Sequence, residues 1–285
     1  MRARGAKNEK AIPPQPTLAP ETTASLLADF VRRETAKAGM RRVVLGLSGG
    51  IDSATAAAIA CRALGPANVL CALLPYRTSS PSSLRDARRV ARKLKMRTVK
   101  VDISPMIDAY FGRRGRATRV RKGNKMARER MSILYDLSAR DAALVLGTSN
   151  KTELLLGYGT IFGDTACAIN PLGDLYKTQV RLLALHLGIP PDVVWKTPSA
   201  DLWTGQSDEG ELGYRYVDID RLLALLVDRR STRAEVIAAG FSRRMVDRIT
   251  ARIVRSQFKR RPPVVAKLSP RTVNIDFRYP RDWGR

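Results

Sequence analysis

The sequence predicts an α/β fold in which a doubly wound, Rossmann-like parallel sheet carries an N-terminal helix and a C-terminal helical extension. Two observations support this prediction. Between residues 42 and 150, short apolar segments alternate with amphipathic segments of helical length, as in successive βαβ units. The apolar segments are continuous rather than alternating, which is typical of strands that are buried on both faces of a sheet.

The individual elements follow from the spacing of apolar residues. A first helix is expected over 21–38, where Leu26, Leu27, Phe30 and Val31 recur at helical spacing. Strands are expected over 42–47, 68–74, 97–101 and 143–147. Helices are expected over 53–64, 81–96, 124–138, from Asn150 onward, and over 218–228, 232–239 and 242–258. The poorly periodic stretches 159–175 and 198–213 are expected to be functional loops.

Length and composition favour one domain with appendages. The chain has 285 residues and is 44% hydrophobic, which is enough for one substantial core. We expect this domain over 20–265, between a disordered, basic and proline-rich tail (1–19) and a C-terminal tail (266–285).

Several classes of protein are disfavoured by what the sequence lacks. No apolar stretch approaches the roughly 20 residues of a membrane span, and the N-terminus has no secretory signal, so we expect a cytoplasmic protein without a membrane partner. Three separated cysteines without a Cys-x-x-Cys pattern predict neither a zinc site nor a disulfide framework. The only histidine, His186, lies among leucines, which disfavours catalysis by a Ser/His/Asp triad.

The chain is strongly basic, which raises nucleic acid as a partner. Its 51 Lys and Arg exceed its 26 Asp and Glu, for a net charge of +25. However, few aromatic residues lie among the basic ones, and no nucleic-acid-binding signature is visible. We therefore favour an acidic small-molecule ligand and a generally basic surface over specific nucleic-acid binding.

The segment Ser48-Gly-Gly-Ile-Asp-Ser53 directly follows a buried strand and predicts a pyrophosphate site. Glycines let the backbone N–H groups approach an anion at the start of a helix, and Ser48 and Ser53 add hydroxyl donors. Asp52 can hold a magnesium ion that neutralises the phosphates. The segment lacks the Gly-Lys-Ser/Thr of a Walker A loop, and a plain glycine turn is the alternative.

Two further groups of residues can contribute to a site. Asn124 and Arg128 are four apart on one predicted helix face and suit phosphates or a carboxylate, although a solvated helix face is the alternative. Thr148 follows another strand, and Glu153 lies in the next helical turn. This arrangement is typical of helix capping, yet it would lie at the same sheet edge as the Ser48 loop, where Glu153 could be a second magnesium ligand.

The sequence resembles the NAD synthetases, within the ATP pyrophosphatase superfamily, from about residue 20 to its end. The resemblance rests on seven motifs that occur in the same order and with similar spacing. They are Ser48-Gly-Gly-Ile-Asp-Ser53, Gly123-Asn124 with Ala127-Arg-Glu-Arg-Met131, Gly147-Thr-Ser-Asn-Lys-Thr-Glu153, Gly163-Asp164, Lys177-Thr-Gln, Ser199-Ala-Asp-Leu202 and Lys259-Arg-Arg-Pro-Pro263. The resemblance implies a ligase that condenses deamido-NAD, ATP and ammonia into NAD, AMP and pyrophosphate through a nicotinyl-adenylate.

The resemblance also implies roles for individual residues. ATP would be bound by Gly46, Leu47, Ser48, Gly49, Gly50, Ile51, Asp52, Ser53, Thr148, Lys177 and Ser199. Mg²⁺ would be held by Asp52 and Glu153, and deamido-NAD by Asn124, Arg128 and Lys259. Lys177 would stabilise the departing pyrophosphate, and Asp164 would bind or deprotonate ammonia. Without the resemblance, Lys177 would be interpreted as an exposed helix residue and Asp164 as a turn residue.

Some positions depart from the pattern of many ammonia-dependent members. Ile161, Ala168 and Phe258 replace a lysine, an aspartate and a histidine that contact the substrate. The sequence around Gly157 is closer to glutamine-dependent members, but too few residues precede the Ser48 loop for their amidohydrolase domain. We therefore expect free ammonia or a separate glutaminase as the nitrogen source, and, by the resemblance, a homodimer.

Two other classes of function remain open from the sequence. Another ATP pyrophosphatase, such as a GMP synthetase or a tRNA-modifying enzyme, shares the Ser48 loop. The former would need its own dimerisation domain and a tRNA thiolase would need paired cysteines, which are absent. A basic nucleic-acid-binding protein regulated by ATP is the second alternative, and it would show salt-dependent RNA binding without release of pyrophosphate.

Overall fold

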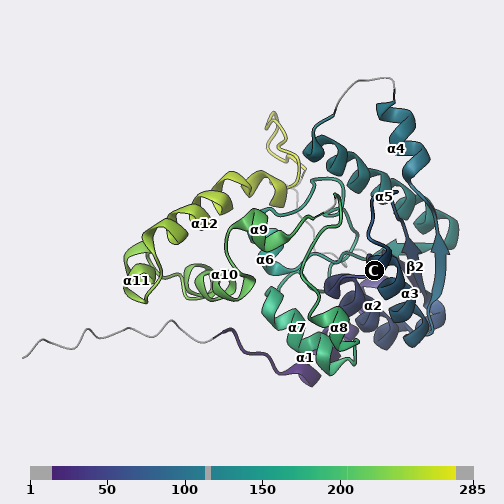
Figure 1. Ribbon diagram of the computed structural model, residues 1–285, viewed down its shortest axis with the longest axis horizontal. Coiled ribbons are helices and arrows are strands. Elements are labelled where there is room, and N and C mark those ends of the chain that lie inside the picture. The colour runs from purple at the N-terminus through teal and green to yellow at the C-terminus, as the bar shows by residue number, and fades with distance from the viewer. Residues whose placement is uncertain (1–14, 113–116, 204, 274–285) are drawn as a thin grey trace, which may run out of the picture.

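A four-stranded parallel sheet lies at the centre of the protein, as shown by a computed structural model that describes residues 15–112, 117–203 and 205–273 (Figure 1). Its strand order is β3-β2-β1-β4. The strands are β1 (Arg42–Gly46), β2 (Val69–Leu73), β3 (Arg97–Lys100) and β4 (Ala143–Val145). Neighbouring strands are parallel throughout, with Val43 opposite both Val69 and Leu144. The predicted doubly wound α/β fold is confirmed.

Helices cover both faces of the sheet because alternate strand residues point to opposite sides. Val43 and Leu45 of β1 pack in a core formed with α1 (Pro20–Lys37), α2 (Ile51–Leu64), α3 (Pro81–Lys93) and α7 (Lys177–His186). Val44 faces the opposite core, formed with α4 (Ser104–Phe111) and α5 (Arg119–Asp141). Strands β1, β2 and β4 are therefore largely buried, as their continuous apolar sequence predicts, whereas the edge strand β3 is mostly exposed.

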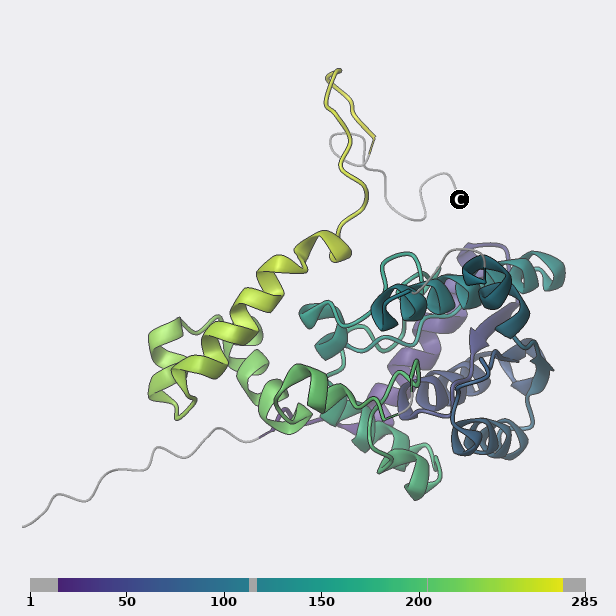
Figure 2. The ribbon, with the colours of Figure 1, turned by 45° about the horizontal axis from the view of Figure 1, so that its top comes forward.

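The C-terminal half adds a helical extension with its own core. It comprises α10 (Tyr216–Leu223), a π-helical turn over Ala224–Asp228, α11 (Arg233–Ala238), α12 (Arg243–Arg255) and a 3-10 turn over Gln257–Arg260. Tyr216, Ile219, Leu222 and Val246 are fully buried in this core. Figure 1 shows these helices beside the sheet domain rather than over it. Figure 2 shows the chain after α12 leaving the body of the molecule as an extended loop, on which Val264 is 95% exposed.

Several element boundaries differ from the sequence-based expectation. The helix expected over 81–96 ends at Lys93, because Lys95 adopts a positive φ of 54°. The helix expected over 124–138 begins earlier, after Thr118, whose hydroxyl accepts a hydrogen bond from the Arg121 N–H. The stretch 198–213, expected to be irregular, contains the short helix α9 (Asp208–Leu212), which Ser207 caps.

The remaining elements are short. They are α6 (Lys151–Leu156), α8 (Pro191–Val194) and a 3-10 turn over Pro66–Asn68. The expected tails 1–19 and 266–285 fall mostly outside the described residues. Within the described part of the chain, no helix is long and apolar enough to span a membrane.

Candidate functional site

A large cleft opens at the carboxyl edge of the sheet, beside the polar segments that follow the neighbouring strands β1 and β4. Its volume is about 1170 Å³. All but one of the site residues predicted from the sequence line this cleft. They are Gly46, Leu47, Ser48, Gly49, Gly50, Ile51, Asp52, Ser53, Asn124, Thr148, Glu153, Asp164, Lys177, Ser199 and Lys259. The exception is Arg128.

The loop between β1 and α2 forms one wall of the cleft. The Ser48 N–H and the Ser48 hydroxyl both bond the Ser53 hydroxyl, at 3.2 and 3.1 Å, which closes the loop on itself. Gly49 has a φ of 82°, and a side chain there would collide with the backbone carbonyl of Ser83. Glycine is therefore required for the tight approach of this loop to α3.

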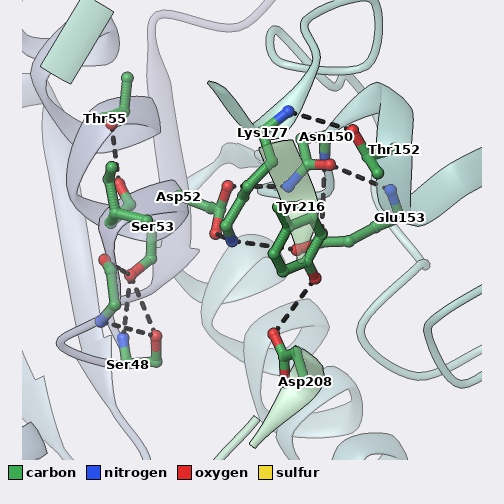
Figure 3. A network of polar contacts seen from close by, with 12 residues as sticks. Ser48, Asp52, Ser53, Thr55, Asn150, Thr152, Glu153, Lys177, Asp208 and Tyr216 are labelled. Carbon is green, nitrogen blue, oxygen red and sulfur yellow. Dashed lines mark hydrogen bonds and ion pairs between the residues drawn. The ribbon is translucent and has the colours of Figure 1, made fainter. Parts of the chain in front are cut away.

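Lys177 forms the centre of the site. Its ammonium contacts the Asp52 carboxylate and lies 3.3 Å from the Glu153 carboxylate (Figure 3). The side chain is only 3% exposed, so the interpretation of Lys177 as an exposed helix residue is wrong. The ring of Tyr216 lies 5.2 Å from the same ammonium. Three elements, α2, α6 and α7, thus bring one cation and two carboxylates together.

The electrostatics of this cluster reflect two acids that share one cation. Burial opposes the charge of Lys177, but Asp52 and Glu153 outweigh it and raise the Lys177 pKa above its ordinary value. Burial, followed by the nearby Asp52 carboxylate, raises the pKa of Glu153 to about 8. Two buried carboxylates therefore face a single cation.

The turn after β4 serves both helix capping and the site. Asn150 and Glu153 form a capping box at the start of α6, in which the Asn150 side chain accepts a hydrogen bond from the Glu153 N–H. The same Asn150 side chain donates to Asp52 at 2.9 Å. The capping box therefore fixes the position of Glu153, and the Asn150 side chain also orients the Asp52 carboxylate.

Asp164 lines another part of the cleft, on the loop over 159–175. Its carboxylate accepts a hydrogen bond from the Thr160 N–H at 2.8 Å. The side chain is open to the cleft, yet the surrounding protein limits its hydration and raises its pKa. Lys259, from the C-terminal segment, donates to the carbonyls of Gly157 and Gly159 at 2.8 and 2.7 Å and so ties this segment to the same loop.

Helix α5 presents a different arginine to the cleft from the one the sequence predicted. Arg128 is exposed, lies outside the cleft lining, and donates to the Ile161 carbonyl at 3.3 Å. Arg130 lines the cleft instead, with its Nε bound to the Leu74 carbonyl at 2.9 Å. Asn124 lines the cleft as predicted and accepts a hydrogen bond from the Thr160 hydroxyl.

The loop that carries Ser199 closes another side of the cleft. The Ser199 hydroxyl accepts a hydrogen bond from the Asp201 N–H at 3.1 Å. The Asp201 carboxylate in turn accepts from the Ser80 N–H at 2.9 Å, which fastens the loop to the start of α3. Asp208, on the unexpected helix α9, also lines the cleft and accepts from the Tyr158 hydroxyl at 2.9 Å.

This fold and site define an α/β protein of the nucleotide-binding type, with a large polar cleft at the carboxyl edge of its sheet. The family model for NAD synthase matches residues 23–263. An NH(3)-dependent NAD(+) synthetase from Chlorobium phaeobacteroides is 55% identical over 258 residues, which cover 90% of this chain and 93% of the relative. A synthetase of the same name from Fusobacterium nucleatum is 51% identical over 242 residues, covering 85% and 94%.

Solved structures agree with the family. An NMN synthetase from Francisella tularensis has a TM-score of 0.79 and 31% identity, covering 88% of this chain and 99% of that one. An NH3-dependent NAD synthetase from Campylobacter jejuni has a TM-score of 0.75 and 34% identity, covering 88% and 100%. The chain belongs to the NAD synthase family.

Proposed function

We propose that this protein is an ammonia-dependent NAD synthetase. It joins ammonia to the nicotinate carboxyl of deamido-NAD, and the cleavage of ATP to AMP and pyrophosphate drives the reaction. The relatives at 51 to 55% identity carry this activity in their names. The observation that carries the proposal is the buried contact of Lys177 with Asp52 and Glu153 beside the Ser48 loop.

The cluster suits the first half of this reaction, in which the carboxylate attacks the α-phosphate of ATP and pyrophosphate leaves. Negative charge develops on the leaving phosphates, and a buried cation stabilises it far better than an exposed one. Lys177 is the cation in this role. The Ser48 loop holds the phosphates through its backbone and hydroxyl groups, and Thr148 and Ser199 complete the ATP site.

The residues present fit a magnesium ion. Mg²⁺ is commonly bound by one or two carboxylates together with substrate phosphates. Asp52 and Glu153 come from α2 and α6 and both contact the Lys177 ammonium, so their carboxylates lie close to each other beside the Ser48 loop. In the described part of the chain, no group of three or more His, Cys, Asp or Glu offers an all-protein metal site. Asp52 and Glu153 would hold the ion, which would neutralise phosphate charge.

The second half of the reaction needs a group that handles ammonia. Ammonium must lose a proton before it can attack the adenylate, and Asp164 lies in the cleft with a raised pKa, which makes it a better base. One proton would pass to the Asp164 carboxylate and the nitrogen would bond the acyl carbon. The acyl–oxygen bond to AMP would then break, AMP would leave, and the nitrogen would release its second excess proton to the departing AMP or to water. Asn124 and Lys259, which line the cleft, are proposed to bind deamido-NAD, and Arg130 takes the place that the sequence analysis gave to Arg128.

We propose that the protein forms a homodimer, as the family resemblance implies. Free ammonia or a separate glutaminase supplies the nitrogen, in keeping with the names of the relatives.

The deciding experiment incubates the pure protein with MgATP, deamido-NAD and ammonium and measures NAD and AMP. Equal amounts of both products are expected, and glutamine alone should not replace ammonium. A parallel reaction with nicotinic acid mononucleotide tests the smaller product named for the Francisella neighbour. Absence of NAD with all three substrates present would contradict the proposed function.

A further inference from the structure

Asp220 is a completely buried acid that lies outside the cleft lining. It belongs to α10, and its exposed fraction is 0%. One carboxylate oxygen accepts a hydrogen bond from the Thr152 hydroxyl at 2.6 Å, and the other accepts from the Thr178 N–H at 2.8 Å. Burial raises the pKa of Asp220, which shows that its environment disfavours the charge. A buried acid is costly to retain and must be hydrogen-bonded, as this one is.

Both donors to Asp220 are chain neighbours of the central site residues. Thr152 precedes Glu153 in the first turn of α6, and Thr178 follows Lys177 in the first turn of α7. The Thr152 hydroxyl, which donates to Asp220, also accepts from the Lys177 N–H at 3.0 Å (Figure 3). Asp220 therefore joins the start of α6 to the start of α7. It accepts directly from the Thr178 N–H, and through the Thr152 hydroxyl it is linked to the Lys177 N–H.

We propose that Asp220 is a positioning residue that holds the Lys177 ammonium at its place beside Glu153 and Asp52. The inference rests on the proposed roles of Lys177 and Glu153. A cation stabilises a transition state only where the charge develops, and a misplacement of about 1 Å can cost about 100-fold in rate. Asp220 does not line the cleft, so it acts on the reaction only through Lys177 and its neighbours.

The test begins with Asp220→Asn, which keeps the side chain's shape but turns one acceptor oxygen into a donor. We expect kcat for pyrophosphate release to fall by about 10- to 100-fold, while the KM for MgATP stays near the wild-type value. Thr152→Val is the second variant. It removes only the linking hydroxyl, keeps the volume, and should lower kcat in the same way even if Asp220→Asn folds poorly.

Asp228→Asn is the matched control. Asp228 also links the starts of α6 and α7, since it accepts from the Lys151 ammonium at 2.8 Å and the Tyr176 hydroxyl at 3.0 Å, but its side chain is 43% exposed. This variant should lower the melting temperature and leave kcat near normal. Equal losses of kcat in the Asp220 and Asp228 variants would overturn the inference, because any weakening of the contact between α6 and α7 would then lower kcat to the same extent.

A second comparison separates positioning from the proposed function itself. In a Lys177→Ala background, Asp220→Asn should cause little further loss, because its effect passes through Lys177. The same fold-loss in both backgrounds would overturn the positioning role. Near-normal activity of Lys177→Ala alone would instead overturn the proposed role of the cluster, whatever Asp220 does.

Discussion

Lys177 forms an ion pair with Asp52 although the two residues are 125 positions apart in the chain. Asp52 lies in the first turn of α2 and Lys177 begins α7, and both helices pack on the same face of the sheet. The parallel topology brings the start of each helix to the carboxyl edge of the sheet, where ligands bind in such folds. The pair therefore follows from the fold as a whole.

Replacement of Asp52 by Asn should lower turnover strongly without unfolding the protein. The change removes the charge that is proposed to hold Mg²⁺, and electrostatic stabilisation by a bound metal is worth several kcal/mol, or about 100-fold or more in rate. The measurement is NAD formation across a Mg²⁺ titration, together with circular dichroism. Asp29→Asn, on the outer face of α1, is the control and should have normal turnover. Near-normal turnover of the Asp52 variant at limiting Mg²⁺ would show that Asp52 is not a metal ligand.

Asp164→Asn and Lys177→Ala should block different halves of the reaction. Asp164→Asn keeps the shape but removes the base, so it should form the adenylate and release pyrophosphate while making NAD about 100- to 10,000-fold more slowly. Lys177→Ala should already fail at pyrophosphate release. Single-turnover quenching with labelled ATP measures both steps. If the Asp164 variant loses pyrophosphate release as completely as the Lys177 variant, Asp164 belongs to ATP or metal binding.

The sequence could predict the parts of the site that lie in local motifs. Ser48 lies in the loop after a recognisable strand, and Asp52 and Glu153 lie in the first turns of the helices that follow two such strands, so their place at the sheet edge follows from periodicity alone. Lys177 carries no such local signal, because a lysine at a helix start is ordinarily solvated. Only the family resemblance indicated it, and the structure shows that two distant acids keep it buried.

The arginine of α5 shows why a helix face is harder to predict than a helix. Asn124 and Arg128 do lie on neighbouring turns, yet Arg128 is not in the stripe of α5 that lines the cleft. That stripe comprises Val120, Asn124, Ala127, Arg130, Met131 and Leu134. This stripe is centred to one side of Asn124, so a residue four positions on falls at its flank. Periodicity specifies which residues share a face, but the packing of α5 against the sheet decides which face meets the cleft.

Arg130→Gln should therefore reduce activity more than Arg128→Gln. A hydrogen bond from a charged group is worth about 1.5–3 kcal/mol, which corresponds to roughly 10- to 100-fold in kcat/KM for the Arg130 variant. The Arg128 variant loses only its contact with the Ile161 carbonyl and should retain most activity. Steady-state kinetics with deamido-NAD as the varied substrate compares the two. A larger loss for Arg128 would support its assignment from the sequence as a substrate ligand.

The contacts of Glu21 predict a pH-dependent contribution to stability. Glu21 joins α1 to α2 and α7, because its carboxylate contacts the Arg62 guanidinium and lies 2.9 Å from His186 Nε2. The hydrogen bond from Arg62, followed by that from His186, lowers the Glu21 pKa to about 2. Since the folded pKa is below the unfolded one, these contacts stabilise the protein above about pH 4.5 and are lost as the pH falls towards 2.

Glu21→Gln should accordingly lower the melting temperature near pH 7 and have a smaller effect near pH 3, where ionising Glu21 in the folded state costs part of the stabilisation because the carboxylate is protonated in the unfolded chain. Thermal denaturation of both proteins at several pH values measures the difference. Asp29→Asn is again the control, because the partners of the Asp29 carboxylate, Arg32 and Arg33, lie on the same helix as Asp29. Exposed ion pairs contribute little to stability, so the effect should be modest but should depend on pH in this direction. A difference between wild type and Glu21→Gln that stays constant from pH 7 to pH 3 would show that the carboxylate's charge is not what joins the three helices.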